Sequence, residues 1–181
     1  MATMASRKLI VALLAIVMLT TATAQTGVAR PIVYVDTVLG GFSIELLDDI
    51  SPNTVANFLK YVTDGDYNDT FFHRAIPGFV LQGGNYRLSA EGVLTQVPVD
   101  APIANEFRLS NIRGTIAMAK LGGNPDSATN QWFVNLADNS ANLDAQNGGF
   151  TVFARVLGSG MDVVDAIVAL PINDLTGDFS N

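Results

Sequence analysis

Residues 71–84, FFHRAIPGFVLQGG, are the most informative part of this sequence. Pro77 and Gly78 predict a turn between two short apolar runs, because these residue types supply the backbone angles that turns require. Side chains alternate along strands, so two paired runs can bring Arg74 and Gln82 together over a shared apolar floor. The segment alone leaves two interpretations of Arg74 open, a stacked structural cation or a functional group held on an apolar wall.

The composition restricts the classes of function. Of 181 residues, 49% are hydrophobic and 15% are charged, which is typical of a globular chain. The sequence has no cysteine, which excludes disulfides and thiolate sites. The net charge of −7 disfavours nucleic acid as a partner, because phosphate backbones bind basic surfaces. Zinc sites commonly need several His, Cys or carboxylate ligands and this sequence has one histidine, so we expect no metal ion and no cofactor.

The N-terminal segment has the pattern of a targeting sequence. Two basic residues precede an apolar run at 9–19, which ends in the small-x-small pattern of residues 22–24. This arrangement is typical of a secretory signal peptide. The alternative is an uncleaved membrane anchor, but the run is shorter than the ~20 residues that cross a bilayer. We therefore expect a cleaved signal peptide at 1–24 and one exported domain at 25–181, with no stable membrane insertion.

The start of this domain has clear strand and helix signals. Alternating residues at 31–37 and 42–47 flank a Gly-Gly turn and predict a β-hairpin. Ser51 and Pro52 suit the N-cap and the first position of a helix, and apolar residues follow at helical spacing. We therefore expect an amphipathic helix over 52–63 with Ser51 as its N-cap.

Short strands dominate the rest of the pattern. Further strand-like runs lie near 70–74, 79–82, 114–119, 131–135 and 150–157. A second helix is expected from about Met161 to before Pro171. Stretches rich in Gly, Asn, Asp and Ser at 85–110 and 121–130 predict long loops. Many short strands with only two helices predict a mainly β fold, an antiparallel barrel capped by helices.

Three further segments follow the first at defined distances. They are GTIAMAK at 114–120, DSATNQWFVN at 126–135 and FTVFARV at 150–156. With FHRAIPGFVLQGG, and in this order, they resemble the cyclophilin family of peptidyl-prolyl cis-trans isomerases, and the resemblance covers nearly all of the expected domain. Together with the signal-peptide pattern, the chain looks like the bacterial exported branch, with a periplasmic or secreted location.

The resemblance implies an eight-stranded antiparallel barrel closed at each end by an α-helix. This implied fold agrees with the two helices and the many short strands of the pattern. Members of the family continue into a final strand, whereas no β-patterned run follows Pro171 here. We therefore expect the last strand to be missing or truncated.

The activity that the resemblance implies is rotation about X–Pro peptide bonds. This rotation is slow because amide resonance sets a barrier of ~18–20 kcal/mol. A donor directed at the prolyl nitrogen favours the twisted state, so no nucleophile, metal or proton relay is needed. The implied partners are proline-containing peptides and unfolded exported proteins, whose folding a monomeric isomerase would assist. The alternative is a non-catalytic proline-binding chaperone or interaction module on the same fold, which would not require a donor such as Arg74.

The resemblance also assigns site residues. Arg74 is the expected donor, Gln82 contacts substrate and steadies Arg74, and His73 has a mainly architectural role beside them. The expected substrate-binding residues are Phe79, Val80, Ala119, Lys120, Gln131, Phe133, Asn142, Leu143 and Phe150. The main chain of residues 119–120 is expected to pair with an extended peptide. Asn142 stands where many members carry an aromatic residue, so we expect weak cyclosporin binding.

Overall fold

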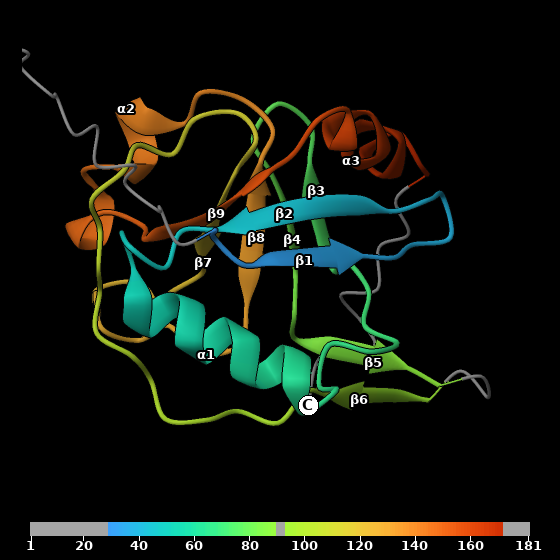
Figure 1. Cartoon of the computed structure of the whole chain (residues 1–181), viewed down its shortest axis with the longest axis horizontal. Helices are drawn as coiled ribbons and strands as arrows, with labels where there is room; N and C mark the ends of the chain where they lie inside the picture. The colour runs from blue at the N-terminus through green and yellow to red at the C-terminus, as the bar shows by residue number, and fades with distance from the viewer. Residues whose placement is uncertain (1–28, 90–92, 172–181) are drawn as a thin grey trace, which may run out of the picture.

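An antiparallel sheet of seven strands is the frame of this computed structural model, which describes residues 29–89 and 93–171. The strands are β1 (Ile32–Val35), β2 (Phe42–Leu46), β3 (Arg74–Ile76), β4 (Val80–Gly83), β7 (Thr115–Met118), β8 (Trp132–Asn135) and β9 (Val152–Val156). They pair in the order β1-β2-β9-β7-β8-β4-β3. In Figure 1, β1 and β2 cross in front of β4 and β8, so the sheet folds over on itself.

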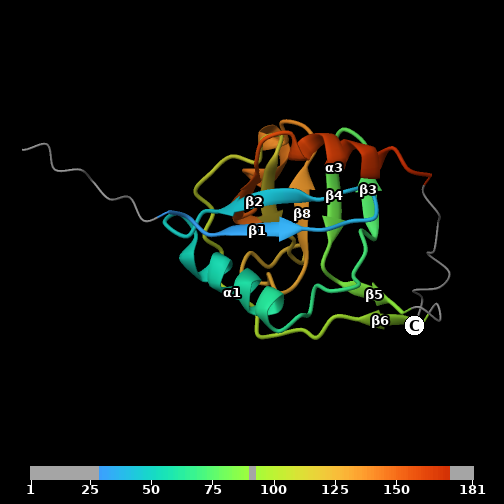
Figure 2. The same cartoon turned by 45° about the vertical axis from the view of Figure 1, so that its right-hand side comes forward.

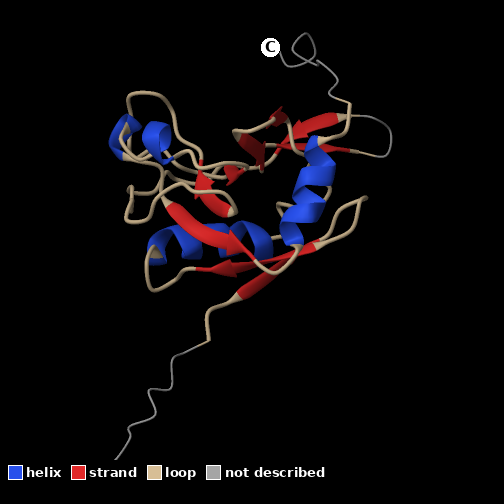
Figure 3. Cartoon of the chain, turned by 90° about the horizontal axis from the view of Figure 1, so that it is seen from above, coloured by secondary structure: helices blue, strands red, loops and turns tan. Residues whose placement is uncertain are grey.

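Strands and loops make up most of the described chain and helices only a small part (Figure 3). This arrangement confirms the predicted mainly β, antiparallel fold. Two predictions concern the ends of the chain, a signal peptide at 1–24 and a missing or truncated last strand after Pro171. Both lie outside the described residues.

The hairpin predicted from the start of the domain is β1–β2, with Val35 opposite Phe42. Alternation along β2 turns Phe42, Ile44 and Leu46 into the core, and each of them is buried. The other face of β2 carries Glu45, which forms ion pairs with Arg30 and Arg155. The polar and apolar faces expected from the sequence pattern are therefore both present.

Two helices lie at opposite ends of the folded sheet, α1 (Pro52–Thr63) and α3 (Gly160–Val168) (Figures 1 and 2). Both match the predicted helices. A short helix α2 (Ser140–Leu143) and a 3-10 turn (Gln146–Gly148) were not predicted, because each is too short to show helical periodicity.

Ser51 occupies the N-cap position of α1, but its side chain does not cap the helix. Its hydroxyl instead donates towards the Val152 carbonyl of β9 (3.2 Å), with the Leu47 carbonyl 3.4 Å away, so it ties α1 to the sheet. The cap is the carboxylate of Glu106, which accepts from the backbone N–H groups of Asn53 (3.3 Å) and Thr54 (2.8 Å). An acidic group at this position also interacts favourably with the helix dipole.

The prediction of one long loop over 85–110 was wrong in part. This stretch contains a two-stranded sheet of β5 (Tyr86–Leu88) and β6 (Leu94–Gln96). Each strand has three residues, and Leu88 is exposed, so the alternation that identifies a strand is too short to detect. The strand expected near 70–74 likewise begins only at Arg74.

Two apolar clusters fill the interior. The larger cluster joins Phe58 of α1 and Val164 of α3 to the sheet, with the Phe58 ring centre 4.9 Å from that of Phe153. The smaller cluster consists of Leu47, Val80, Ala117, Phe133, Leu143 and Val152. Three of its members line a pocket at the surface, so close packing holds that pocket in a fixed shape.

Candidate functional site

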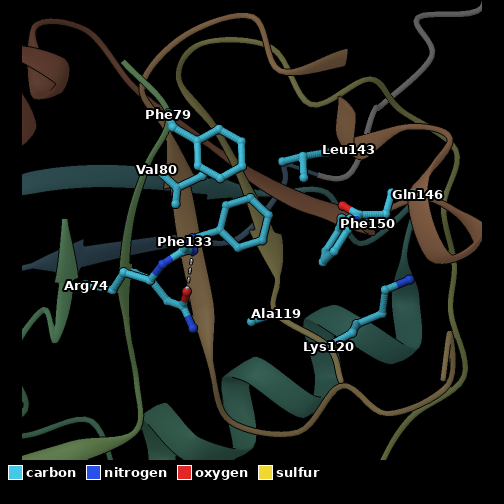
Figure 4. Close-up of a pocket in the computed structure, with 10 residues that line it drawn as sticks. Arg74, Phe79, Val80, Ala119, Lys120, Phe133, Leu143, Gln146 and Phe150 are labelled. Carbon is cyan, nitrogen blue, oxygen red and sulfur yellow. Dashed lines mark hydrogen bonds between the residues drawn. The ribbon is translucent and has the colours of Figure 1, made fainter. Parts of the chain in front are cut away.

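A pocket of about 220 Å³ opens beside β4 and β8 (Figure 4). Its walls come from segments that are far apart in the sequence. They are Arg74, Phe79, Val80, Gln82, Ala119, Lys120, Phe133, Leu143, Gln146 and Phe150. Nine of these ten are residues that the sequence predicted for the site, and the fold brings those nine together.

Arg74 and Gln82 are cross-strand partners in the β3–β4 pair, as the sequence predicted. The turn between these strands has Gly78 at φ +72°, a conformation that suits glycine, and the Phe79 N–H donates to the Ile76 carbonyl. Arg74 Nη1 lies 3.2 Å from Gln82 Oε1. The guanidinium carbon also lies 5.8 Å from the centre of the Phe79 ring. These two contacts hold an exposed cation at the edge of an apolar pocket.

A second hydrogen bond extends this pair towards β8. Gln82 Nε2 donates to Gln131 Oε1 over 2.9 Å. Arginine can only donate, so the Gln82 carbonyl must face Arg74 and its amide must face Gln131. Gln131, which is not itself part of the pocket wall, therefore fixes the orientation of Gln82, and Gln82 fixes that of Arg74.

His73 is half-buried behind this row of polar groups and does not line the pocket. Burial lowers the pKa of His73, the Arg74 charge lowers it further, and a hydrogen bond to Gln131 partly opposes both effects. Within the described residues, its buried Nδ1 atom has no hydrogen-bond partner. A proton added there would lack an acceptor, which also disfavours the charged imidazolium.

The floor of the pocket is apolar and nearly closed to solvent. Val80, Phe133 and Leu143 are each at most 4% exposed. Phe150 packs on this floor, with its ring centre 5.8 Å from that of Phe133 and the rings at 69°. A small apolar ring that entered this pocket would lose water contacts and gain close packing on several sides.

Three buried asparagines support the pocket from behind. The Asn139 side-chain amide donates to the Phe79 carbonyl (2.9 Å) and to Asn135 Oδ1 (2.7 Å). Asn135 in turn donates to Asn111 Oδ1, and Asn111 donates to the Phe150 carbonyl (3.0 Å). This network links two separate walls of the pocket, those at Phe79 and at Phe150. Sequence reasoning missed these residues, since an asparagine next to a strand gives no signal of what it contacts.

Three residues lie differently from the prediction. Gln131 was expected to bind substrate, but it contacts Gln82 and is not part of the pocket wall. Asn142 is exposed and is not part of the pocket wall, because its neighbour Leu143 is the residue of α2 that turns inward. Gln146 lines the pocket and was not predicted. The only available signal for Gln146 was its place in the short segment between Leu143 and Phe150.

Nowhere in residues 29–89 and 93–171 do three His, Cys, Asp or Glu side chains gather in a way that could hold a metal ion. The same residues include no helix with the length and apolar character needed to cross a membrane.

Comparison with known proteins identifies the family. The family model for cyclophilin-type peptidyl-prolyl cis-trans isomerases matches residues 32–178. The chain is 42% identical to a peptidyl-prolyl cis-trans isomerase of Acinetobacter baylyi, over 80% of this chain and 76% of that protein. It is 45% identical to peptidyl-prolyl cis-trans isomerase B of Escherichia coli, over 71% of this chain and 78% of that protein.

Solved structures show the same fold. A cyclophilin-type peptidyl-prolyl cis-trans isomerase of Cryptosporidium parvum superposes with a TM-score of 0.64 at 23% identity, over 80% of this chain and 88% of that chain. The fold, the family model and the relatives all agree. This chain belongs to the cyclophilin-type peptidyl-prolyl cis-trans isomerase family, and it is an enzyme of that class.

Proposed function

We propose that this enzyme isomerises X–Pro bonds of exported proteins in the pocket of Figure 4, with Arg74 as the donor that lowers the barrier. The observation that carries the proposal is the position of Arg74 at the edge of an apolar pocket, oriented by Gln82. Proline fits such a pocket because its ring is apolar and its nitrogen carries no hydrogen.

Isomerisation of an X–Pro bond requires few catalytic groups besides this donor. In the planar ground state the prolyl nitrogen lone pair is delocalised into the carbonyl, which gives the barrier of ~18–20 kcal/mol. In the twisted state the lone pair is localised on nitrogen and accepts a hydrogen bond. The guanidinium of Arg74 is permanently charged, so it binds the twisted state more strongly than the planar one.

The remaining residues have supporting roles in this proposal. Phe79, Val80, Phe133, Leu143 and Phe150 hold the proline ring, and Gln82 orients Arg74 and contacts the peptide. The Ala119 N–H already donates to the Gln131 carbonyl (2.9 Å), so main-chain pairing with the peptide uses the other backbone groups of residues 119–120. His73 transfers no proton, which agrees with its lowered pKa and with its position outside the pocket wall.

The test is NMR exchange of an Ala-Pro-Phe peptide with purified wild type and Arg74→Ala. Loss of one preorganised donor is expected to lower the rate about 10²-fold. Arg74→Lys is the matched control, since it keeps the charge but loses the planar fork that contacts Gln82, and it should recover only part of the rate. Folded wild type that binds the peptide without accelerating exchange would instead support the proline-binding chaperone.

The proposed role in export rests on residues 1–24, with their basic start, apolar run and small-x-small end. Expression of the full chain in a bacterium should give a periplasmic or secreted protein that begins at Gln25. Mass spectrometry of the fractionated protein measures this directly. An intact N-terminus in the cytoplasmic or membrane fraction would contradict the export proposal and leave the isomerase proposal untouched.

A further inference from the structure

The loop between α2 and β9 has an unusual backbone. Asn147, Gly148 and Gly149 follow one another with φ of +52°, +75° and +76°. Such angles suit glycine and are uncommon for other residues. Gly149 also packs directly against the Phe107 ring, where a side chain would collide. A segment in this conformation needs neighbouring groups to hold it.

Lys120 supplies two of the contacts that hold this loop. Its Nζ atom donates to the carbonyls of Asn147 (2.8 Å) and Gly149 (2.6 Å) and lies 4.9 Å from the centre of the Phe150 ring. Hydrogen bonds from a charged donor are about twice as strong as neutral ones. The third carbonyl, that of Gly148, accepts from Asn105 (2.7 Å). Lys120 therefore binds the carbonyls of Asn147 and Gly149, and Asn105 binds the Gly148 carbonyl between them.

The ammonium group is partly withdrawn from water at this position. Burial lowers the pKa of Lys120, and the nearby Asp126 charge opposes that effect. A buried ammonium needs hydrogen-bond acceptors, and the two loop carbonyls provide them. The loop carbonyls therefore satisfy the Lys120 ammonium group, and the ammonium group in turn satisfies those carbonyls.

The loop matters because of the residues at its ends. Gln146 and Phe150 both line the pocket, and the stem of Lys120 lines it from the opposite segment (Figure 4). We propose that Lys120 is a positioning residue whose ammonium group clamps the 146–150 loop and so sets the pocket wall that holds the substrate proline. This inference rests on the proposed function for its substrate, and it assigns to the Lys120 side chain a role separate from main-chain pairing.

The variants that test the clamp are Lys120→Met and Lys120→Arg. Methionine keeps an unbranched apolar stem without donors, whereas arginine keeps the charge and several donors. Lys60→Met is the matched control for loss of charge, because Lys60 lies on α1 and pairs with Asp64 and Asp100 rather than with the pocket. Two measurements are made on each folded variant: the affinity and kcat for an Ala-Pro-Phe peptide, and hydrogen exchange at the Gly149 amide.

The Gly149 amide reports on the loop directly, since it donates to the Gln146 carbonyl (2.9 Å). Lys120→Met should weaken peptide binding about five- to tenfold, leave kcat within about twofold and speed Gly149 exchange at least about tenfold. Lys120→Arg should restore most of the affinity and protection, and Lys60→Met should match wild type in both.

Wild-type affinity and wild-type Gly149 exchange in folded Lys120→Met would overturn the clamp. If Lys120→Met does not fold, Lys120→Leu, which also lacks a donor, takes its place, and unchanged affinity and exchange in that variant would overturn the clamp equally. A wild type that binds the peptide but does not isomerise it would contradict the proposed function, while affinity and Gly149 exchange would still test the clamp.

Discussion

Arg74 and Gln82 lie directly opposite each other on β3 and β4, with the guanidinium donating to the Gln82 carbonyl over 3.2 Å. Because Gln82 donates in turn to Gln131, the orientation of the cation is set by a row of side chains on β3, on β4 and at the residue that precedes β8. The Arg74 side chain is exposed, but Gln82 restricts the orientation of its guanidinium group. Preorganisation of this kind favours a transition state because little reorientation is needed when the prolyl nitrogen becomes an acceptor.

Replacing Gln82 with leucine should therefore lower the isomerisation rate although Arg74 remains. We expect a loss of about tenfold in kcat/KM, which corresponds to about 1.4 kcal/mol. Gln82→Glu is the informative second variant. Its carboxylate can accept from Arg74 but, when ionised, cannot donate to Gln131, so its kcat/KM should lie between those of Gln82→Leu and wild type. NMR exchange of an Ala-Pro-Phe peptide measures all three. Wild-type rates in Gln82→Leu would show that Arg74 is oriented by other contacts.

Local patterns explain why the Arg74–Gln82 pair and the first helix could be predicted, whereas the other site residues were assigned by the family resemblance. The turn at Pro77 and Gly78 sets the register of two short strands, so the pairing of Arg74 with Gln82 follows from counting residues. The helix at 52–63 follows from apolar spacing and an initial proline. Each of these signals lies within a dozen residues of what it determines.

Contacts between distant segments could not be predicted in this way. Glu106 caps α1 from 52 residues away, while the local candidate Ser51 contacts the sheet. Asn111 reaches Phe150 across 39 residues. Polar side chains such as these have several possible partners, and only the folded arrangement of the segments selects one.

His73 should make stability depend on pH in a defined direction. Its pKa in the folded protein is lowered below the ordinary value of 6.5, chiefly by burial. Between the folded and unfolded pKa values the unfolded chain binds more protons, so stability falls as the pH drops from about 6.5 through the lowered pKa and then levels off. His73→Gln should lack this component. Urea unfolding from pH 7.5 to 5 measures it in both proteins.

The titration can also be followed at the residue itself, because the sequence contains one histidine. NMR of the imidazole should give a pKa below 6.5, and the isomerisation rate of the folded protein should not follow this titration. A measured pKa above 6.5, or activity that follows the His73 titration, would contradict the supporting role of this residue.

Glu106→Gln should destabilise the protein through α1. The Glu106 carboxylate accepts from Asn53 and Thr54 at the helix N-terminus, and loss of a cap costs about 1 kcal/mol. Burial tends to raise the pKa of Glu106, but its hydrogen bonds from Thr54 and Asn53 together lower it below 4.5. The stability it contributes is therefore present above pH 4.5 and is lost as the pH falls through the lowered pKa.

Urea unfolding of wild type and Glu106→Gln at pH 7 should show this difference, and the difference should shrink below pH 4.5. Asp36→Asn, which makes the same change of charge at an exposed position of the β1–β2 hairpin, should change stability by less than about 0.5 kcal/mol. Equal effects of the two changes would show that net charge, rather than the cap, is responsible.

Asn139→Ala should affect both stability and peptide binding. Asn139 is 7% exposed, and its loss leaves Asn135 Oδ1 without its Asn139 donor and removes one of two donors to the Phe79 carbonyl, which still accepts from the Leu136 N–H. A buried polar group left unpaired costs about 1–3 kcal/mol, so unfolding should become at least about 1 kcal/mol easier. Because Phe79 lines the pocket, peptide affinity should fall as well.

The control is Asn142→Ala, at an exposed neighbouring position in α2, which should change stability by less than about 0.5 kcal/mol. Unfolding in urea and NMR titration with the peptide measure both variants, and a destabilised Asn139→Ala with unchanged peptide affinity would show that the buried network supports the fold without positioning Phe79.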